Sequence, residues 1–589
     1  MTTHTADRRG LLAAAVLAAG LLWLAAAGGG IFAWAPCVAA VVFSAAWWLN
    51  GRPRGTEGRL TRVEVAGLAI LAFSLLTLLP LPARVSALPK TERLAQNRLV
   101  QTTLREAAAA GLPGTPSAAV FALTRNRVGT MRLAVLVTAA FAAAMLAAGL
   151  GPRARRGHLR FLAVLGAATA VLGYIGQWRI PQGDTLWWFI RIPHALPGPV
   201  AGFVNRNHYA GFLALLCPAA CALLADDLTR RRWLGAAAAA ACLAAMTVAL
   251  AVALSRGALI AFAAGMTATV IGLLLVRRAL LALVLAVSLA LLVAGLLARA
   301  DPGVRARMRT LADLGATESF QHRVGMARDA LRAWRAYPII GAGGNAFRAV
   351  YPQFRTTSER EYSVHAANAY VQLLVEGGCA GALLFGLLGA VLWRDMRRAA
   401  AAPDNPPDRL FRLAAAGAAA AAAAHALGEC ALHLPLYAVT LASIVGLALR
   451  PPPAAGAAGA RRGGPALICL ACLALLTPAW RDMQRLDAPD ELWVANARDV
   501  ARALIGAPTS WQAWYEFGRR VAALERPGAG RLAEACVSRA TECDPNNYRL
   551  WLAAGHYRLA SKDYAGARRA FARARQLRSW VEVPFVPEK

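Results

Sequence analysis

Four polar stretches carry the residues of this sequence that could do chemistry, and each lies at the end of a long apolar run. They are 205–209 with Arg206 and His208, 255–257 with Arg256, 299–369 with Arg323 and His365, and 429–435 with Glu429 and His433. Guanidinium groups bind anions such as diphosphate through charge-assisted, often bidentate hydrogen bonds. An imidazole can take a proton from a hydroxyl near neutral pH. These residue types therefore predict an anion site with a proton acceptor beside it, if the fold brings the stretches together.

Each stretch also has a purely structural interpretation when it is taken alone. An Arg at the end of an apolar helix commonly extends its charge to the lipid headgroups, and a lone His such as His365 or His433 often caps a helix or bonds to backbone. Gly341, Gly343 and Gly344 follow no strand and lack the dinucleotide-binding spacing, so they predict a tight turn and not a phosphate cradle.

Aromatic residues precede the first polar stretch: Trp178, Trp187, Trp188 and Phe189. Such residues are typical of the aromatic belt at a membrane surface, and a platform on which sugars stack is the alternative. The belt is the simpler prediction.

The composition indicates what kind of protein must position the four polar stretches. The chain has 589 residues, of which 58% are hydrophobic and 16% charged, whereas soluble domains carry roughly 25% charged residues. The net charge of +32 suggests a nucleic-acid binder, but the cations punctuate apolar runs and do not cluster on one soluble surface. The ten cysteines lie mostly within apolar runs, where Cys behaves as a small hydrophobe. We therefore expect a membrane protein with no nucleic-acid partner, no disulfide framework and no metal site.

About thirteen apolar runs have the length that a hydrocarbon core of roughly 30 Å requires. They are 11–27, 31–49, 65–82, 131–150, 159–176, 208–225, 234–254, 257–276, 279–298, 370–393, 413–432, 434–449 and 465–480. The first run follows Arg8 and Arg9 as in a signal peptide, but it shows no clear cleavage site. It is therefore predicted to be the first spanning helix.

Arginines in the short loops predict the orientation of these spans, because short basic loops stay in the cytoplasm. With the N-terminus inside, every second loop is short and basic: 52–62, 153–156, 230–232, 277–278, 394–398 and 450–462. The alternate loops face outward and include the three longest, near 83–130, 177–207 and 299–369. All four polar stretches fall on that outer face, so a shared outer site is predicted.

The last hundred residues are soluble in character and follow an odd number of spans, so they are also predicted outside. Two units match the tetratricopeptide pattern, in which small residues let paired helices approach while aromatic residues fill the gap. One unit carries Trp551, Gly555, Tyr564, Ala567, Phe571 and Ala574, and the other carries Trp514, Gly518, Ala533, Ala540 and Pro545. A helical stretch near 490–506 is expected to cap them.

The predicted fold class is thus all-α: a polytopic bundle of about 12–13 transmembrane helices with a large outer loop and a soluble helical domain at the C-terminus. We divide the chain into residues 1–200 (N-terminal transmembrane helices), 201–450 (transmembrane core with outer loop 299–369), 451–489 (linker and last span) and 490–589 (tetratricopeptide-like repeats).

The polar stretches resemble the O-antigen ligase and polysaccharide polymerase superfamily of multi-pass bacterial membrane proteins. The resembling segments are Asn205-Arg-Asn-His-Tyr-Ala-Gly, Leu254-Ser-Arg-Gly-Ala, Arg323 through Pro338-x-x-Gly-x-Gly to Tyr351-Pro352, and His365-Ala-Ala-Asn-Ala-Tyr-Val-Gln-Leu-Leu-Val-Glu-Gly-Gly-Cys-Ala-Gly. The resemblance covers roughly residues 200–450. It implies an inverting glycosyltransferase of the type C kind that needs neither a metal nor another cofactor, with a site facing the periplasm.

The resemblance also implies roles for individual residues. Arg206 and Arg256 would hold the diphosphate of an undecaprenyl-diphosphate-linked glycan, Arg323 would assist, and His365 would take the proton of the acceptor hydroxyl. The remaining residues expected to contact substrate are Asn205, Asn207, His208, Asn368, Glu376 and His433.

This sequence departs from the family at one point, because Ala367 stands where many members have a His directly before the Asn. His365 lies two residues earlier, about 200° away on a helix, so it can serve only if the chain is irregular there. His208 and His433 are the alternative bases.

The acceptor is left open by these motifs: lipid A core, a further glycan or a protein hydroxyl are all compatible. The C-terminal repeats slightly favour polymerisation or protein glycosylation, because such repeats commonly bind protein partners. A lipid-carrier transporter and a non-catalytic assembly scaffold are the alternatives outside the enzymes. In each case the chain is expected in the bacterial inner membrane among its lipids, with a cytoplasmic N-terminus and a periplasmic C-terminal domain.

Overall fold

The computed structural model describes residues 2–30, 32, 34–50, 60–79, 91–116, 119–179, 185–186, 190–191, 200–253, 255–275, 318–356, 364–401, 406–449, 464–476, 492 and 495–587. Within these residues the chain is almost wholly helical. Its strands there are one antiparallel pair, β1 (Thr185–Leu186) and β2 (Ile190–Arg191). The predicted all-α class is confirmed. The predicted span 279–298 lies outside the described residues, as do Trp187, Trp188 and Phe189.

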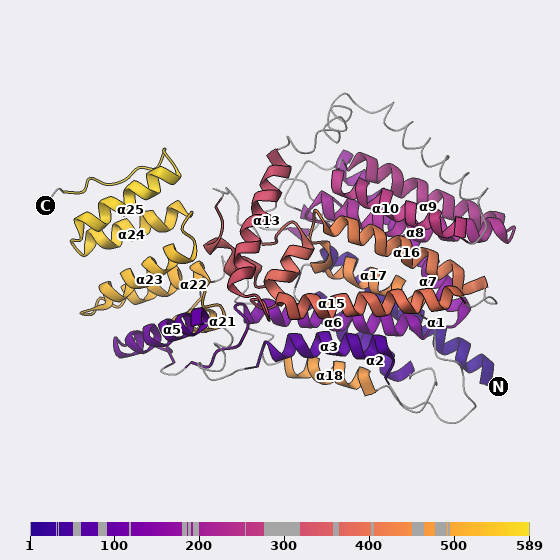
Figure 1. The fold of residues 1–589 in the computed structure, drawn as a ribbon, viewed down its shortest axis with the longest axis horizontal. Helices are drawn as coiled ribbons and strands as arrows, with labels where there is room; N and C mark the ends of the chain where they lie inside the picture. Colours follow the sequence, from indigo (N-terminus) through magenta and orange to yellow (C-terminus); the bar gives the residue numbers. More distant parts are fainter. Residues whose placement is uncertain are drawn as a thin grey trace.

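Twelve described helices match the other predicted spans. They are α1 (Thr2–Ala26), α2 (Trp34–Asn50), α3 (Arg62–Leu76), α6 (Arg127–Ala148), α7 (Pro152–Arg179), α8 (Arg206–Thr229), α9 (Trp233–Val252), α10 (Arg256–Leu275), α15 (Ala369–Ala401), α16 (Pro406–Ala426), α17 (Pro435–Ala448) and α18 (Gly464–Leu476). Seven of the described helices are long and apolar enough to cross a membrane, and α2, α17 and α18 are shorter apolar helices. Together they form one bundle (Figure 1), in which α17 packs on α6 and α18 on α2.

Helix α8 lies at the centre of one half of the bundle, packed against α7, α9, α10 and α16. Small residues allow these helices to approach closely. This is usual in membranes, because surrounding lipid leaves no hydrophobic driving force for helix association and close packing takes its place. A Cβ on Gly265 of α10 would lie 3.1 Å from Pro218 of α8 and 2.9 Å from the backbone oxygen of Gly417 in α16. Gly265 and Pro218 both lie near the middle of their helices, and the chain passes through α9 between α8 and α10, reversing direction at each end of α9. Helices α8 and α10 therefore run in parallel and begin at the same end of the bundle. We call it the site end.

Helix α15 is broken near this end, at Gly378, whose φ is 61°. The segment that follows α13 (Glu318–Ala336) fills the break: Cys379 N donates to Pro338 O (2.8 Å) and Ala380 N to Ile339 O (2.9 Å). A Cβ on Gly341, whose φ is +67°, would lie 2.1 Å from Glu376 O. Gly341, Gly343 and Gly344 therefore form a tight turn against the break in α15. Irregular backbone in a membrane protein must find its hydrogen-bond partners within the protein.

Each C-terminal helix packs antiparallel to the next one along the chain. These helices are α21 (Ala497–Gly506), α22 (Trp511–Ala522), α23 (Ala529–Cys543), α24 (Tyr548–Ala560) and α25 (Tyr564–Leu577). A Cβ on Gly555 would lie 2.3 Å from the ring of Phe571, so the predicted small residue does let α24 and α25 approach. The paired helices lie beyond the site end, and the N-terminus lies at the opposite end of the bundle (Figure 1).

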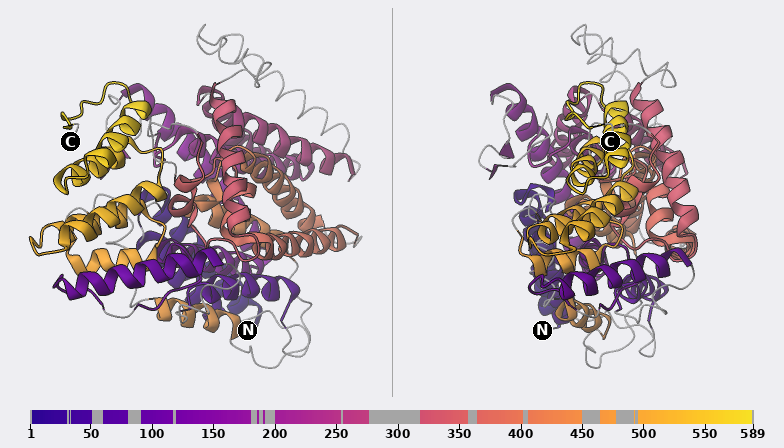
Figure 2. Two further views of the ribbon diagram at one scale, coloured as in Figure 1. Left: turned by 60° about the vertical axis from the view of Figure 1, so that its left-hand side comes forward. Right: turned by 90° about the vertical axis from the view of Figure 1, so that its left-hand side faces the viewer.

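Helix α5 (Thr91–Ala109), from the predicted outer loop 83–130, packs against α21 and α23 (Figure 2). A second predicted outer loop reaches the same domain, because Arg355 Nη2 lies 2.8 Å from Asp544 Oδ1 and Asn546 Nδ2 donates to Arg355 O (2.7 Å). Arg355 follows α14 (Phe347–Val350) and η3 (Tyr351–Gln353). The C-terminal helices thus contact two segments that the arginine pattern assigns to the outer face.

Candidate active site

Glu429 is the centre of the first polar cluster at the site end, in the turn between α16 and η4 (Ala431–His433). Its Oε1 accepts from Asn207 Nδ2 and from Arg323 Nη2, both at 2.8 Å. Its Oε2 lies 3.5 Å from His208 Nε2. We call these four residues the Glu429 cluster. Three predicted residues from α8 and α13 therefore meet on one carboxylate.

The Glu429 carboxylate is ionised. Burial by itself would raise its pKa, but the hydrogen bond from His208 and the positive charge of Arg323 outweigh burial and lower the pKa to about 2. Arg323 also donates to the backbone oxygen of Gly428. The cluster therefore presents an imidazole whose Nε2 faces a fixed negative charge.

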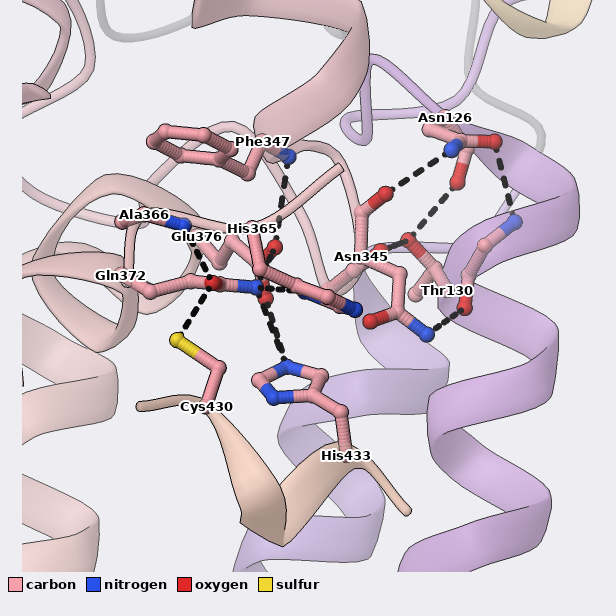
Figure 3. A network of polar contacts seen from close by, with 12 residues as sticks. Asn126, Thr130, Asn345, Phe347, His365, Ala366, Gln372, Glu376, Cys430 and His433 are labelled. Carbon is pink, nitrogen blue, oxygen red and sulfur yellow. Dashed lines mark hydrogen bonds and ion pairs between the residues drawn. The ribbon is translucent and has the colours of Figure 1, made fainter. Parts of the chain in front are cut away.

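Gln372 is the centre of the second cluster, and its side chain is fully buried. Its Oε1 accepts from Ala366 N (3.0 Å) and from the thiol of Cys430 (3.1 Å). Its Nε2 donates to Glu376 Oε1 (2.9 Å) and faces two imidazoles, at 3.1 Å from His365 Nδ1 and 3.2 Å from His433 Nε2 (Figure 3). We call Gln372, His365, His433, Glu376 and Cys430 the Gln372 cluster.

His365 lies in irregular chain, which satisfies the geometric condition set by the missing neighbouring His. Helix α15 begins only at Ala369, and Asn368 Oδ1 caps it by accepting from Tyr370 N (3.0 Å) and Val371 N (3.1 Å). Ala367, between His365 and Asn368, has a φ of +50°. The ring of His365 faces that of His433, with centroids 4.8 Å apart.

The His365 imidazole is held neutral. Burial and then the nearby charges of His433 and His208 hold its pKa well below the usual value. His208 belongs to the Glu429 cluster, and Glu429 directly precedes Cys430 of the Gln372 cluster. The two clusters are therefore side by side, joined by consecutive residues of one turn.

Glu376 links the Gln372 cluster to the glycine turn. Its Oε1 also accepts from Phe347 N (3.2 Å), and its Oε2 lies 3.6 Å from His433 Nε2. Its backbone oxygen accepts from Gly343 N at 2.9 Å.

A polar network on α6 holds the other side of this turn (Figure 3). Asn126 Nδ2 donates to Asn345 O (2.8 Å), and Thr130 Oγ1 donates to Gly344 O (2.8 Å). The turn that carries the glycine motif is therefore a support for the site.

Arg206 and Arg256 are the first residues of α8 and α10. Both are half-buried, and their helices pack in parallel with both N-termini at the site end. The N-terminal end of a helix carries partial positive charge that adds to that of the guanidinium groups. The site end can therefore attract an anion at the same end of the bundle as both histidine clusters.

Two predicted site residues have their side chains engaged by backbone. Asn205 caps α8 by accepting from Asn207 N at 2.8 Å. Asn368 caps α15 and donates through Nδ2 to Leu427 O at 3.1 Å. Both position neighbouring site residues in this structure.

Gln372 was missed by the sequence analysis. The signal was present, because Asn368, Gln372 and Glu376 are spaced by four and so share one face at the start of α15, where most other side chains are apolar. Among the described residues, no group of three or more His, Cys, Asp or Glu side chains is arranged to hold a metal ion.

Residues 240–386 match the protein family Wzy_C, described as O-Antigen ligase. This range extends from α9 into α15 and contains Arg256, Arg323, His365, Gln372 and Glu376. No curated protein matches the chain. The chain therefore carries an O-antigen ligase domain, as expected of the superfamily that its polar stretches resemble.

Proposed function

We propose that this protein is a membrane glycosyltransferase that moves a glycan from an undecaprenyl-diphosphate carrier to an acceptor hydroxyl on the periplasmic side of the bacterial inner membrane. The main support is the pairing of Arg206 and Arg256 at the N-terminal ends of two parallel, directly packed helices. Both arginines lie at the same end of the bundle as the two histidine clusters, within and around the O-antigen ligase domain.

The two arginines bind the diphosphate of the donor. As the bond from the sugar C1 to the phosphate oxygen breaks, its electron pair leaves with the diphosphate, where negative charge grows. Fixed guanidinium groups stabilise that charge more in the transition state than in the ground state. Arg323 contributes positive charge while it holds Glu429. These residues supply the leaving-group stabilisation without calling on a metal.

The acceptor oxygen forms its bond to C1 on the face opposite the departing diphosphate, so the configuration inverts, and its proton passes to an imidazole. Family resemblance assigns that proton to His365. His208 is the second candidate, because the Glu429 carboxylate faces its Nε2 and can stabilise an imidazolium. Asn205, Asn207, Asn368, Glu376 and His433 complete the substrate site.

The acceptor in this proposal is a further glycan repeat or a protein hydroxyl, with lipid A core as the alternative. The C-terminal helices contact the segment that carries Arg355, and they favour the first two because helical repeats commonly present a surface that binds protein partners. Under this proposal residues 490–589 are tetratricopeptide-like repeats outside the cytoplasm, and residues 201–450 are the catalytic core.

Deletion of the gene, with profiling of surface glycans and glycoproteins, tests the proposal. We expect loss of one glycan class and restoration by the wild-type gene. Arg206→Ala and Arg256→Ala should each fail to restore it at normal membrane levels. Arg230→Ala, at the other end of α8 in an exposed pair with Asp226, is the matched control and should restore it. An unchanged glycan profile in the deletion strain would exclude the function.

A reporter fused after Lys589 tests the orientation. The proposal expects activity of a periplasm-specific reporter at this position. A cytoplasmic signal would overturn the assignment of the site end to the periplasm.

A further inference from the structure

We infer that Gln372 fixes the proton of His365 on Nε2, so that this imidazole donates a hydrogen bond to the substrate while His208 takes the proton of the acceptor hydroxyl. The inference rests on the proposed function and assigns roles within the same site. In it Gln372 is a positioning residue that acts through His365.

The orientation of the Gln372 amide is determined by its other partners. The backbone N–H of Ala366, 3.0 Å away, must face the carbonyl oxygen, and the Glu376 carboxylate, 2.9 Å away, must face the NH₂ group. A flipped amide would set oxygen against carboxylate and N–H against N–H, which are both repulsive. The NH₂ group therefore faces the two imidazoles.

An amide nitrogen has two hydrogens and no lone pair to offer. One hydrogen of Gln372 goes to Glu376 Oε1, and the other is directed to the imidazole nitrogens at 3.1 Å (His365 Nδ1) and 3.2 Å (His433 Nε2). A proton on Nδ1 of His365 would point at this NH₂ group. Nδ1 is therefore the unprotonated nitrogen, and because the ring is neutral its single proton is on Nε2.

An imidazole with its proton on Nε2 cannot accept a second one there without first passing the proton on. His365 therefore offers an N–H to an oxygen of the donor glycan or its diphosphate. His208 has the opposite arrangement: its Nε2 faces Glu429 Oε2 at 3.5 Å, which leaves the lone pair on Nδ1. A carboxylate that orients one nitrogen of an imidazole and stabilises its cation is the usual partner of a general base.

Substitution by Gln separates a donor from a base, because a Gln amide can supply an N–H near the position of Nε2 but cannot take up a proton. We expect His365→Gln to keep glycan product within about tenfold of wild type, and His365→Ala to lose about 100-fold or more. His208→Gln and His208→Ala should both lose about 100-fold or more, as expected for loss of a general base. Membrane levels of all four variants are measured alongside.

The opposite pattern overturns the inference. If His365→Gln is as inactive as His365→Ala while His208→Gln retains product, His365 is the base.

A measurement independent of activity tests the role of Gln372 directly. The ¹⁵N NMR shifts of histidine-labelled protein in lipid bilayers report which ring nitrogen carries the proton, with His365 assigned by its absence in His365→Gln. We expect an unprotonated Nδ1 in the wild type. In Gln372→Glu, which has nearly the same shape, an oxygen replaces the NH₂ group and should draw the proton to Nδ1.

A wild-type spectrum with the proton on Nδ1, or one unchanged by Gln372→Glu, would contradict the inference. The spectrum remains decisive even if gene deletion leaves every glycan unchanged. Failure of the proposed function and failure of the inference are therefore distinguishable.

Discussion

The Glu429 cluster and the Gln372 cluster are neighbours of similar composition, yet they place His208 and His365 in different electrostatic surroundings. His208 faces a carboxylate that an Arg keeps ionised, whereas His365 faces an amide that offers hydrogen bonds but no charge. His433, the second histidine of the Gln372 cluster, lies 3.6 Å from the Glu376 carboxylate. An imidazole beside a fixed negative charge can become a cation, whereas one beside an N–H donor stays neutral. The difference shows how one site can give two histidines separate roles.

The two clusters should also differ in what it costs to break them. Removing one partner of a buried ion pair leaves an uncompensated charge, which costs about 3–5 kcal/mol. Removing one neutral hydrogen-bonding group costs about 1–3 kcal/mol. Variants that remove one group at a time separate these two costs.

Glu429→Gln should have the largest effect. Arg323 and His208 lose their counter-charge together, so we expect a stability loss of about 3–5 kcal/mol and loss of glycan product. Thermal unfolding in detergent and glycan profiling measure the two effects. Glu542→Gln, in an exposed pair with Arg539, is the matched control and should change stability by less than about 1 kcal/mol. Equal effects of both variants would show that the Glu429 cluster is not held by charge.

Gly343→Ala tests the support of the Gln372 cluster. The φ of Gly343 is +101°, and a Cβ would lie 2.0 Å from Thr124 Oγ1. Backbone strain alone costs about 1–3 kcal/mol, and the displaced turn would carry Glu376 with it. Gly386→Ala in α15 is the comparison, because a Cβ there meets nothing within 4 Å. If the two variants unfold at the same temperature, the turn does not support the cluster.

The pH dependence of stability should separate the clusters. His365 has a lowered pKa, so below its ordinary value of 6.5 the unfolded chain binds a proton that the folded chain refuses. Stability is therefore fully present above that pH and falls below it. The lowered pKa of Glu429 acts in a more acidic window, from 4.5 down to about 2. Unfolding of wild type and His365→Gln from pH 8 to 4.5 should diverge below about 6.5, and parallel curves would be inconsistent with a neutral His365.

Asp544→Asn should have the smallest effect on glycan product, because Asp544 lies in neither cluster. Burial raises the pKa of Asp544, although Arg355 and its hydrogen bonds oppose this. An amide still accepts from Arg355 but removes the counter-charge of this buried guanidinium, so we expect a stability loss of about 3–5 kcal/mol and unchanged product per folded protein. A loss of glycan at normal membrane levels would instead show that the C-terminal domain controls the site.

The sequence predicted the fold class, most helix positions and the gathering of polar residues at one end, because these follow from local patterns. An apolar run long enough to cross the lipid must form a helix, because its backbone groups find no water to bond there. Asn205 and Asn368 precede such helices and cap them as short polar side chains do. The small residues Gly555 and Gly518 likewise predicted closely packed helix pairs.

The break at Gly378 and the docking of α5 on the C-terminal helices were not predicted. The break depends on the segment after Tyr337, whose backbone oxygens receive the N–H groups of Cys379 and Ala380. The docking of α5 depends on Val100 and Leu104, which enter the apolar core of the C-terminal helices. Both arrangements join segments far apart in the chain, where local periodicity carries no information.

By itself, the sequence determined that this is a helical membrane protein with Arg and His side chains collected at one end. Apolar length and loop charge act locally and add along the chain, so they can be read without coordinates. Only the tertiary structure decided which groups face each imidazole. The charge and proton position of a histidine depend on contacts within a few ångströms, here from Gln372 and Glu429, and folding brings those contacts together from different helices.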